Sequence, residues 1–218
     1  MIDIVLKHHG IILSGFLTTI VIVGLGFVIG SLFGVVLGCM RNASTRWLRW
    51  SVATYVSVIR NTPFLIQAML LFALLGVLRI RIAPEVVGAA SVALYTAGYM
   101  SEIIRGALKT VSAGQWEASR SLGLKPLQTF RLVVFPQLLS FAVPASTNLL
   151  ATVTKESAFL SALSVAELTF SGQVVIAQTF AVFEIWAIIA ILYLLLTMSL
   201  FSVSAWFEQH RLRASILS

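Results

Sequence analysis

The sequence predicts an all-α integral membrane protein with five transmembrane helices. Its 218 residues are 59% hydrophobic and only 11% charged, whereas soluble domains carry roughly 25% charged residues. The apolar residues also fall in long stretches, and about 20 helical residues cross the roughly 30 Å hydrocarbon core of a bilayer. Because the spans use most of the chain, we predict a single transmembrane domain over residues 1–218. The five predicted spans are at about 11–39, 52–78, 86–104, 131–153 and 181–207.

The positions of the basic residues predict the orientation. A net charge of +7 also fits a nucleic-acid-binding protein, but most Lys and Arg residues cluster in three segments: after span one, between spans three and four, and after span five. The positive-inside rule places these segments in the cytoplasm, with the N-terminus outside and the C-terminus inside. Arg79 and Arg81 are the exceptions. We therefore predict membrane lipid and no nucleic acid as a partner. The clustered residues are Arg41, Arg46, Arg49, Arg105, Lys109, Arg120, Lys125, Arg131, Arg211 and Arg213.

The first span carries a stripe of small residues. Its apolar run exceeds the 7–15 residues of a signal-peptide core, so we expect it to remain attached. Glycines spaced four residues apart lie on one side of a helix and let another helix approach closely. Self-association and packing on another span of the same chain both explain the stripe. It consists of Gly26, Gly30, Gly34 and Gly38.

The second span contains an arginine and a proline. Arg60 lies eleven residues beyond Arg49, or roughly 16 Å along a helix. Pro63 removes a backbone donor and disturbs the helix, which is tolerated where the backbone is buried in protein or faces water. We expect Arg60 to face the bundle interior or an aqueous cavity, because an intramembrane charge is costly. Snorkelling of Arg60 to the inner surface is the alternative.

A short cytoplasmic helix is predicted at about 113–123. Ser112 and Gln115 have the spacing of a capping box, and Gly123 suits a C-terminal cap. Such a helix is too short to be stable alone. Its Trp116 and Leu122 therefore need a partner surface, or the membrane surface, to cover them.

The last third of the chain is predicted to contain two spans separated by an outer segment. Lys155-Glu156-Ser157 ends span four on the outer side. Residues 158–180 are only moderately apolar and include Glu167. We interpret them as an outer-facing helix and loop, not as a sixth span.

The predicted cytoplasmic helix resembles the EAA motif of ABC-importer membrane subunits. Glu117-Ala118-Ser119 is followed after three residues by Gly123, and then by Val133 and Pro136. Ser119 stands where the family usually has Ala, and Phe135 where it has Leu. Other segments resemble the polar amino-acid uptake family (histidine, glutamate, glutamine, arginine and opine type): Arg60-Asn61-Thr62-Pro63 with Gln67, Tyr99 to Gly106, Lys155-Glu156-Ser157, and Glu167-Leu168-Thr169.

This resemblance implies a type I ABC-importer permease fold in the bacterial cytoplasmic (inner) membrane. The implied partners are a second permease subunit, identical or homologous, two cytosolic ATP-binding subunits and an extracytoplasmic substrate-binding protein. The short helix would dock on the ATPase, which binds ATP and Mg. The residues implied in this coupling are Gln115, Trp116, Glu117, Ala118, Ser119, Leu122 and Gly123.

The chain itself is predicted not to be an enzyme. It has no G-x-x-x-x-G-K-[ST] phosphate-binding run and no nucleophile–base pattern. We expect no cofactor and no metal on this chain, since His8, His9 and His210 lack the spacing of a metal site.

The predicted cargo is a polar amino acid, which needs a cation for its carboxylate and an anion for its ammonium group. The candidate substrate-binding residues are Arg60, Thr62, Glu102, Glu156 and Ser157. Glu102 and Arg105 are also spaced for an intrahelical pair. Glu156 has three possible roles: it binds the α-ammonium, it selects basic cargo (arginine, lysine, ornithine or histidine), or it only pairs with Lys155.

Two other classes of protein fit parts of the sequence. An ion-coupled secondary transporter or channel subunit would use the intramembrane charges without ATP, but such transporters commonly have two repeat halves, and no second half is visible. A membrane scaffold explains the spans without explaining the EAA motif. Co-purification of an ATPase subunit discriminates the importer from both.

Overall fold

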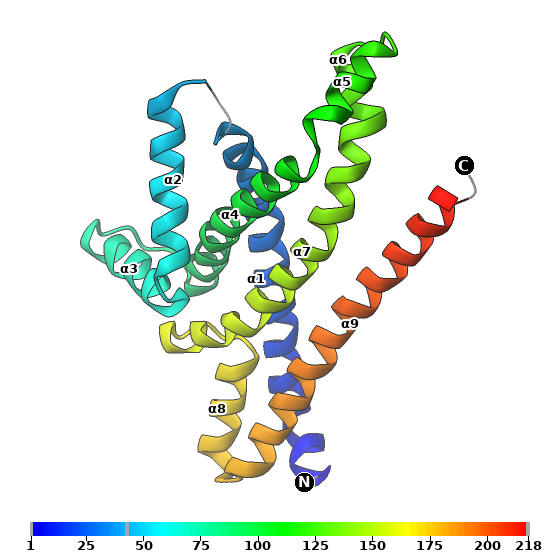
Figure 1. Ribbon diagram of the computed structural model, residues 1–218. Helices are drawn as coiled ribbons and strands as arrows, with labels where there is room; N and C mark the ends of the chain where they lie inside the picture. The colour runs from blue at the N-terminus through cyan, green and yellow to red at the C-terminus, as the bar shows by residue number, and fades with distance from the viewer. Residues whose placement is uncertain (1, 42–43, 217–218) are drawn as a thin grey trace.

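The computed structural model describes the backbone of residues 2–41 and 44–216, and the side chains of 7–41 and 44–205. Every regular element in these ranges is helical, which confirms the all-α prediction. In Figure 1, α5, α6 and the first turn of α2 lie toward the upper end, and the start of α1 and the turn between α8 and α9 lie at the lower end. The elements are α1 (Ile2–Met40), α2 (Arg46–Asn61), α3 (Phe64–Val77), α4 (Pro84–Thr110), α5 (Ala113–Ser121), α6 (Pro126–Thr129), the π-helical turn η1 (Phe130–Val134), α7 (Phe135–Glu156), the 3₁₀ segment η2 (Ser157–Leu163), α8 (Leu168–Thr179) and α9 (Val182–Ile216).

Three helical stretches of the described chain are long and apolar enough to cross a bilayer: Lys7–Met40, Pro126–Leu163 and Val182–Ala205. The pair α2 and α3 makes a fourth if it is counted as one broken span. Helix α4 has 27 residues, about 40 Å at 1.5 Å per residue, but it is more polar. The five-span count therefore remains a prediction.

The span predicted at 52–78 is broken at Pro63, the residue that was expected to disturb its helix. The chain forms two helices there, α2 and α3, whose axes are bent by 113°. Thr62 is extended, with φ −119° and ψ 144°, because a residue before proline is driven out of the helical region. Pro63 then precedes the first turn of α3.

The glycine stripe of α1 packs against α4 of the same chain. A Cβ added to Gly30 would lie 2.4 Å from the carbonyl oxygen of Ala93, closer than side-chain contacts allow. This packing within the chain accounts for the stripe without self-association. At Gly26, Gly34 and Gly38 the nearest atoms, 2.5–2.8 Å away, belong to Val92, Met100 and Ile104.

The segment 158–180 is a helix and loop, as predicted. Helix α8 has 12 residues, about 18 Å at 1.5 Å per residue, too short to cross a bilayer. The fully buried Glu167 caps its N-terminus, accepting hydrogen bonds from the amides of Phe170 (2.8 Å) and Thr169 (2.9 Å). Tyr193 of α9 donates to the same carboxylate at 2.7 Å. Glu167 thus ties α8 to α9.

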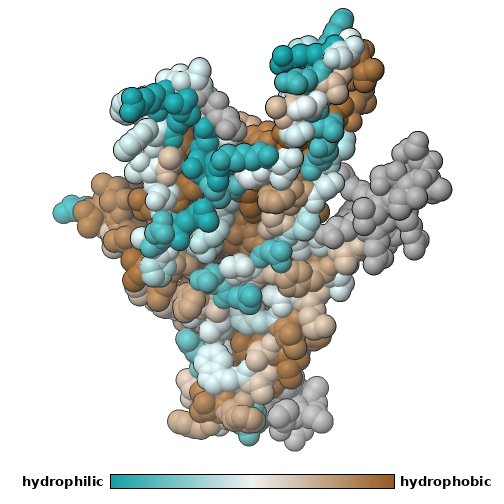
Figure 2. All heavy atoms as spheres, viewed as in Figure 1, coloured by the Kyte–Doolittle hydropathy of each residue, from teal (hydrophilic) through white to brown (hydrophobic). Residues whose placement is uncertain are grey.

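The surface divides into apolar and polar regions. Large apolar side chains of α1, α3 and α9 are exposed, including Leu32 (66%), Leu70 (65%) and Leu195 (58%). Figure 2 shows hydrophobic residues over α3 and along the lower flanks, and hydrophilic residues over α2 and down the middle of the same face. The apolar regions suit contact with lipid.

Candidate functional site

Two side chains hold the break between α2 and α3. Helix α2 ends at Asn61, and the extended Thr62 followed by Pro63 leaves carbonyls near the break without amide donors. The Gln67 amide of α3 fills this gap, donating to the carbonyls of Ile59 (2.8 Å) and Thr62 (2.9 Å). The Thr62 hydroxyl donates to the carbonyl of Val58 at 2.9 Å. The break predicted from Pro63 is therefore a defined structure.

Arg60 extends from the last turn of α2 toward α4. Its Nη1 lies 3.6 Å from Oε1 of Glu102, and 43% of its side chain is exposed. The guanidinium carbon is 5.7 Å from the centre of the Tyr99 ring, within the range of a cation–π contact. Arg60 thus faces the charged and aromatic side chains of α4.

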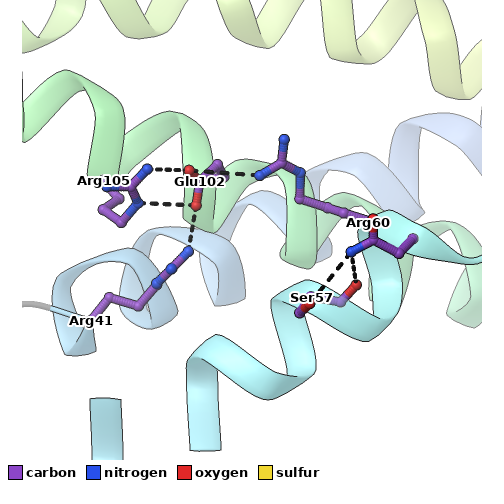
Figure 3. Close-up of polar contacts among 6 residues, drawn as sticks. Arg41, Ser57, Arg60, Glu102 and Arg105 are labelled. Carbon is purple, nitrogen blue, oxygen red and sulfur yellow. Dashed lines mark hydrogen bonds and ion pairs between the residues drawn. The ribbon is translucent and has the colours of Figure 1, made fainter. Parts of the chain in front are cut away.

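Three arginines converge on Glu102 (Figure 3). Arg105 donates through Nε to Oε2 at 3.0 Å and through Nη2 to Oε1, so the predicted intrahelical pair is present. Arg41, from the end of α1, donates to Oε2. Together with Arg60, the cluster joins α1, α2 and α4. The bond between Arg41 and Glu102 was not predicted, because the two residues are 61 positions apart in the sequence.

A cavity of about 360 Å³ opens beside this cluster. Asn61 in its wall donates to the carbonyl of Ser57 at 2.7 Å. Small-molecule sites in proteins have volumes of about 300–1,000 Å³, so the cavity suits a small polar ligand. Its lining residues are Arg41, Ala53, Val56, Ser57, Arg60, Asn61, Tyr99 and Glu102.

A larger cavity of about 540 Å³ lies along the first half of α2. It is lined by α2 alone, with the exposed Trp47 and Trp50 as its main walls. Its lining contains none of the residues predicted to bind cargo. The smaller, charged cavity is the better candidate.

Glu156 and Ser157 lie outside the charged cavity. Glu156 is the last residue of α7 and directly follows Lys155. Ser157 is buried, and its hydroxyl donates to the carbonyl of Thr154 at 2.7 Å. The structure therefore brings Arg60 and Glu102 together, but it does not bring Glu156 into their cluster.

Two aromatic rings of α4 lie next to Arg60. Tyr95 packs on Tyr99 with the ring centres 4.6 Å apart. Tyr99 in turn faces Arg60. Both tyrosines belong to α4. Sequence analysis did not select them, and the signal available was their spacing of four residues on the helix that carries Glu102.

The short helix predicted at about 113–123 is α5, Ala113–Ser121. Gly123 follows it with φ +73°. The amide of Leu124 bonds to the carbonyl of Ser119 at 3.0 Å, and the amide of Gly123 bonds to that of Arg120 at 2.9 Å. This is a Schellman motif, which requires a left-handed residue at the position of Gly123.

The capping box predicted for Ser112 and Gln115 is wrong. The Ser112 side chain makes no capping bond, and Gln115 uses its backbone amide to contact the carbonyl of Ser112 at 3.1 Å. A capping-box bond instead opens α6, where Oε1 of Gln128 accepts from the amide of Lys125 at 2.8 Å. Pro126 at the first position of α6 favours a helix start there.

Most of the predicted coupling residues are accessible. Gln115, Glu117, Ala118, Leu122 and Gly123 are exposed, and Trp116 is partly exposed. Ser119 instead is buried, and its hydroxyl donates to the carbonyl of Gln115 at 2.7 Å. Leu122 (80%) and Leu127 of α6 (76%) are both uncovered apolar side chains. Leu127 was not among the predicted residues, although a leucine in a charged segment is a usable signal.

These features define a class of protein. The chain combines apolar helices, a charged cavity beside a broken helix and an exposed short helix at one end, as expected for a membrane permease subunit that works with partner chains. A family model described as "Binding-protein-dependent transport system inner membrane component" matches residues 30–213. The chain belongs to this family and is a permease subunit of an ABC importer in the bacterial inner membrane. Membership decides against the secondary-transporter and scaffold alternatives.

Similar proteins cover nearly the whole chain. A probable amino-acid ABC transporter permease, y4tG of Sinorhizobium fredii, is 32% identical over 85% of this chain and 80% of its own length. The glutamine transport system permease GlnP of Escherichia coli is 32% identical over 87% of this chain and 88% of its own length. The nopaline transport system permease NocM of Agrobacterium fabrum is 29% identical over 99% of this chain and 95% of its own length.

Solved structures share the fold. A crystal structure of an amino acid ABC transporter with histidines matches with a TM-score of 0.87 and 31% identity, over 94% of this chain and 96% of that chain. An inward-facing structure of the MetNI methionine ABC transporter matches with a TM-score of 0.71 and 22% identity, over 97% of each chain. The second likeness concerns the fold alone.

Proposed function

We propose that this chain forms half of the translocation pathway of an ATP-driven importer for polar amino acids. The observation that carries the proposal is the charged cavity at the break of α2, into which a partly exposed arginine projects. The relatives named for amino-acid, glutamine and nopaline transport favour this class of cargo.

The proposed importer needs other chains. A second permease subunit, identical or homologous, completes the pathway, and an extracytoplasmic binding protein delivers the amino acid. Two cytosolic subunits bind ATP and Mg and hydrolyse the ATP, so this chain is not an enzyme. Helix α5 docks on an ATP-binding subunit, since its exposed Leu122 needs a covering surface.

Two charged residues divide the recognition of the cargo. Arg60 binds the α-carboxylate through charge-assisted hydrogen bonds. Glu156 binds either the α-ammonium group or a basic side chain of the cargo. If it binds a basic side chain, the importer prefers arginine, lysine, histidine or ornithine. In the proposed site Glu102 faces Arg60, Thr62 caps the end of α2 that carries Arg60, and Ser157 directly follows Glu156.

Replacing Arg60 with methionine should abolish uptake of all amino acids, because every amino acid carries the α-carboxylate.

Replacing Glu156 with glutamine should weaken uptake of L-arginine more than that of L-glutamine if the Glu156 carboxylate binds the basic side chain. The measurement is uptake of each radiolabelled amino acid by proteoliposomes that contain the assembled importer and its binding protein.

Arg81→Met is the matched control, since it removes an exposed arginine that does not line the charged cavity. An equal loss for both amino acids in Glu156→Gln would assign Glu156 to the α-ammonium. Undiminished uptake in an assembled Arg60→Met importer would contradict the carboxylate site.

We also propose five spans, with the N-terminus outside and the C-terminus inside. In a Cys39→Ala background, cysteines at Arg46 and Lys125 should react with a membrane-impermeant maleimide only from the cytoplasmic side. A cysteine at Gln173 should react only from outside. All of these residues are exposed, and labelling is measured in right-side-out and inverted vesicles.

A cysteine at Arg81 tests the bent pair of helices. Reaction from outside makes α2 and α3 one broken span, as proposed. Reaction from the cytoplasmic side makes them a re-entrant loop and reduces the count. Outside labelling at position 125 would overturn both the orientation and the docking surface.

A further inference from the structure

The cluster around Glu102 carries unbalanced charge. Three guanidinium groups, of Arg41, Arg60 and Arg105, contact or face one carboxylate. They leave two positive charges in excess. Their side chains are only 20–43% exposed, so water screens the charges incompletely. The cavity should therefore attract an anionic group.

The three arginines share Glu102 unequally. Arg105 engages both carboxylate oxygens, and Arg41 donates to one of them. Nη1 of Arg60 lies 3.6 Å from Oε1 of Glu102, beyond hydrogen-bond distance for an N–H donor. Arg60 is also the most exposed of the three, at 43% against 20% for Arg41 and 25% for Arg105. Of the three guanidinium groups, that of Arg60 is therefore the most accessible to a ligand in the cavity.

We propose that Arg41 is a positioning residue that keeps Arg60 available to the cargo. This role rests on the proposed function, in which Arg60 binds the cargo carboxylate. Arg41 and Arg105 together neutralise Glu102. Without Arg41, the free acceptor sites of Glu102 bind the adjacent Arg60 guanidinium and compete with the cargo carboxylate. Glu102 is then a counter-ion whose charge balance sets the affinity, and it does not itself bind the cargo.

A competing explanation is that Arg41 only ties the end of α1 to α4, or itself contacts the cargo, since it lines the cavity. These explanations differ in their response to removal of Glu102. If Arg41 acts through Glu102, deleting the carboxylate should restore what the loss of Arg41 removes. If Arg41 acts directly, the second deletion restores nothing.

The test is a double-mutant cycle with Arg41→Gln, Glu102→Gln and the double variant in the assembled importer. KM and kcat are measured for uptake of L-glutamine and L-arginine into proteoliposomes. Arg41→Gln should raise KM about tenfold with little change in kcat, as expected for a lost charge pair at a binding site. Glu102→Gln should lower KM about threefold, because the competing acceptor is removed.

The double variant should return KM to within about twofold of the wild type, because its cluster again carries two excess positive charges. Arg46→Gln, at the exposed start of α2, controls for general loss of positive charge. Chromatographic elution and thermal denaturation of the complex report assembly. If Arg41→Gln does not assemble, the lowered KM of Glu102→Gln still tests the proposal.

An unchanged KM in Arg41→Gln, a double variant as weak as Arg41→Gln, or a raised KM in Glu102→Gln would each overturn the role of Arg41. Failure of the proposed function gives a different result. In that case Arg60→Met retains uptake with the wild-type KM, whatever the cycle shows.

Discussion

Replacing Gly30 with leucine is expected to separate α1 from α4 and to remove most of the correctly folded protein from the membrane. A Cβ at this position would lie 2.4 Å from the carbonyl oxygen of Ala93 and 2.6 Å from Cβ of Thr96. Neither atom belongs to the end of a flexible side chain, so whole helices must move apart. Overpacking of a core typically costs about 1–3 kcal/mol, and a leucine at a backbone contact should exceed this range.

The measurement is the yield and melting temperature of the detergent-solubilised importer. Gly24→Leu is the matched control, because it makes the same change on the same helix where no atom lies within 4 Å of the added Cβ. Equal yield and stability of the two variants would show that the contact between α1 and α4 is not the close packing described here.

Replacing Gly123 with proline is expected to uncouple ATP hydrolysis from transport while leaving the protein in the membrane. Gly123 has φ +73°, whereas proline is restricted to about −65°. Proline also removes the amide that bonds to the carbonyl of Arg120 at 2.9 Å. No atom lies within 4 Å of a Cβ at this position, so the effect arises from the backbone and not from packing. Helix α5 then loses its C-terminal cap and its direction relative to α6.

Cargo-stimulated ATP hydrolysis and co-purification of the ATPase subunit measure this effect. Ala113→Pro is the matched control, because Ala113 is the first residue of α5 and the preceding Ser112 is already extended, which is where proline is tolerated. Transport that stays coupled in Gly123→Pro would contradict the assignment of α5 as the coupling helix.

The elements that sequence analysis predicted best are those with local causes. The end of α5 depends on the left-handed conformation of Gly123, and the break after α2 depends on Pro63. Both follow from the covalent structure of one residue. The capping box at Ser112 failed because such a bond is worth only about 1 kcal/mol, so another backbone arrangement can replace it.

The candidate site was predicted in part. Arg60 was selected because an intramembrane charge is costly, and the structure places it at a charged cavity. The acidic residue beside Arg60 could not be predicted, because a charge does not indicate which opposite charge will lie next to it. Both Glu102 and Glu156 were candidates for cargo binding, and the ion pair of Arg60 is with Glu102.

The sequence by itself determined the class of this protein: its apolar stretches require a bilayer, and its EAA-like segment requires a partner. It also determined where helices break and end, since these depend on the backbone limits of single residues. Only the tertiary structure decided that the glycine stripe of α1 receives α4 and that α2 and α3 meet at 113°. It alone joined Arg41 to Glu102 across 61 positions. Such contacts depend on how whole helices pack, and helical periodicity defines the face that a helix presents without defining the helix that covers it.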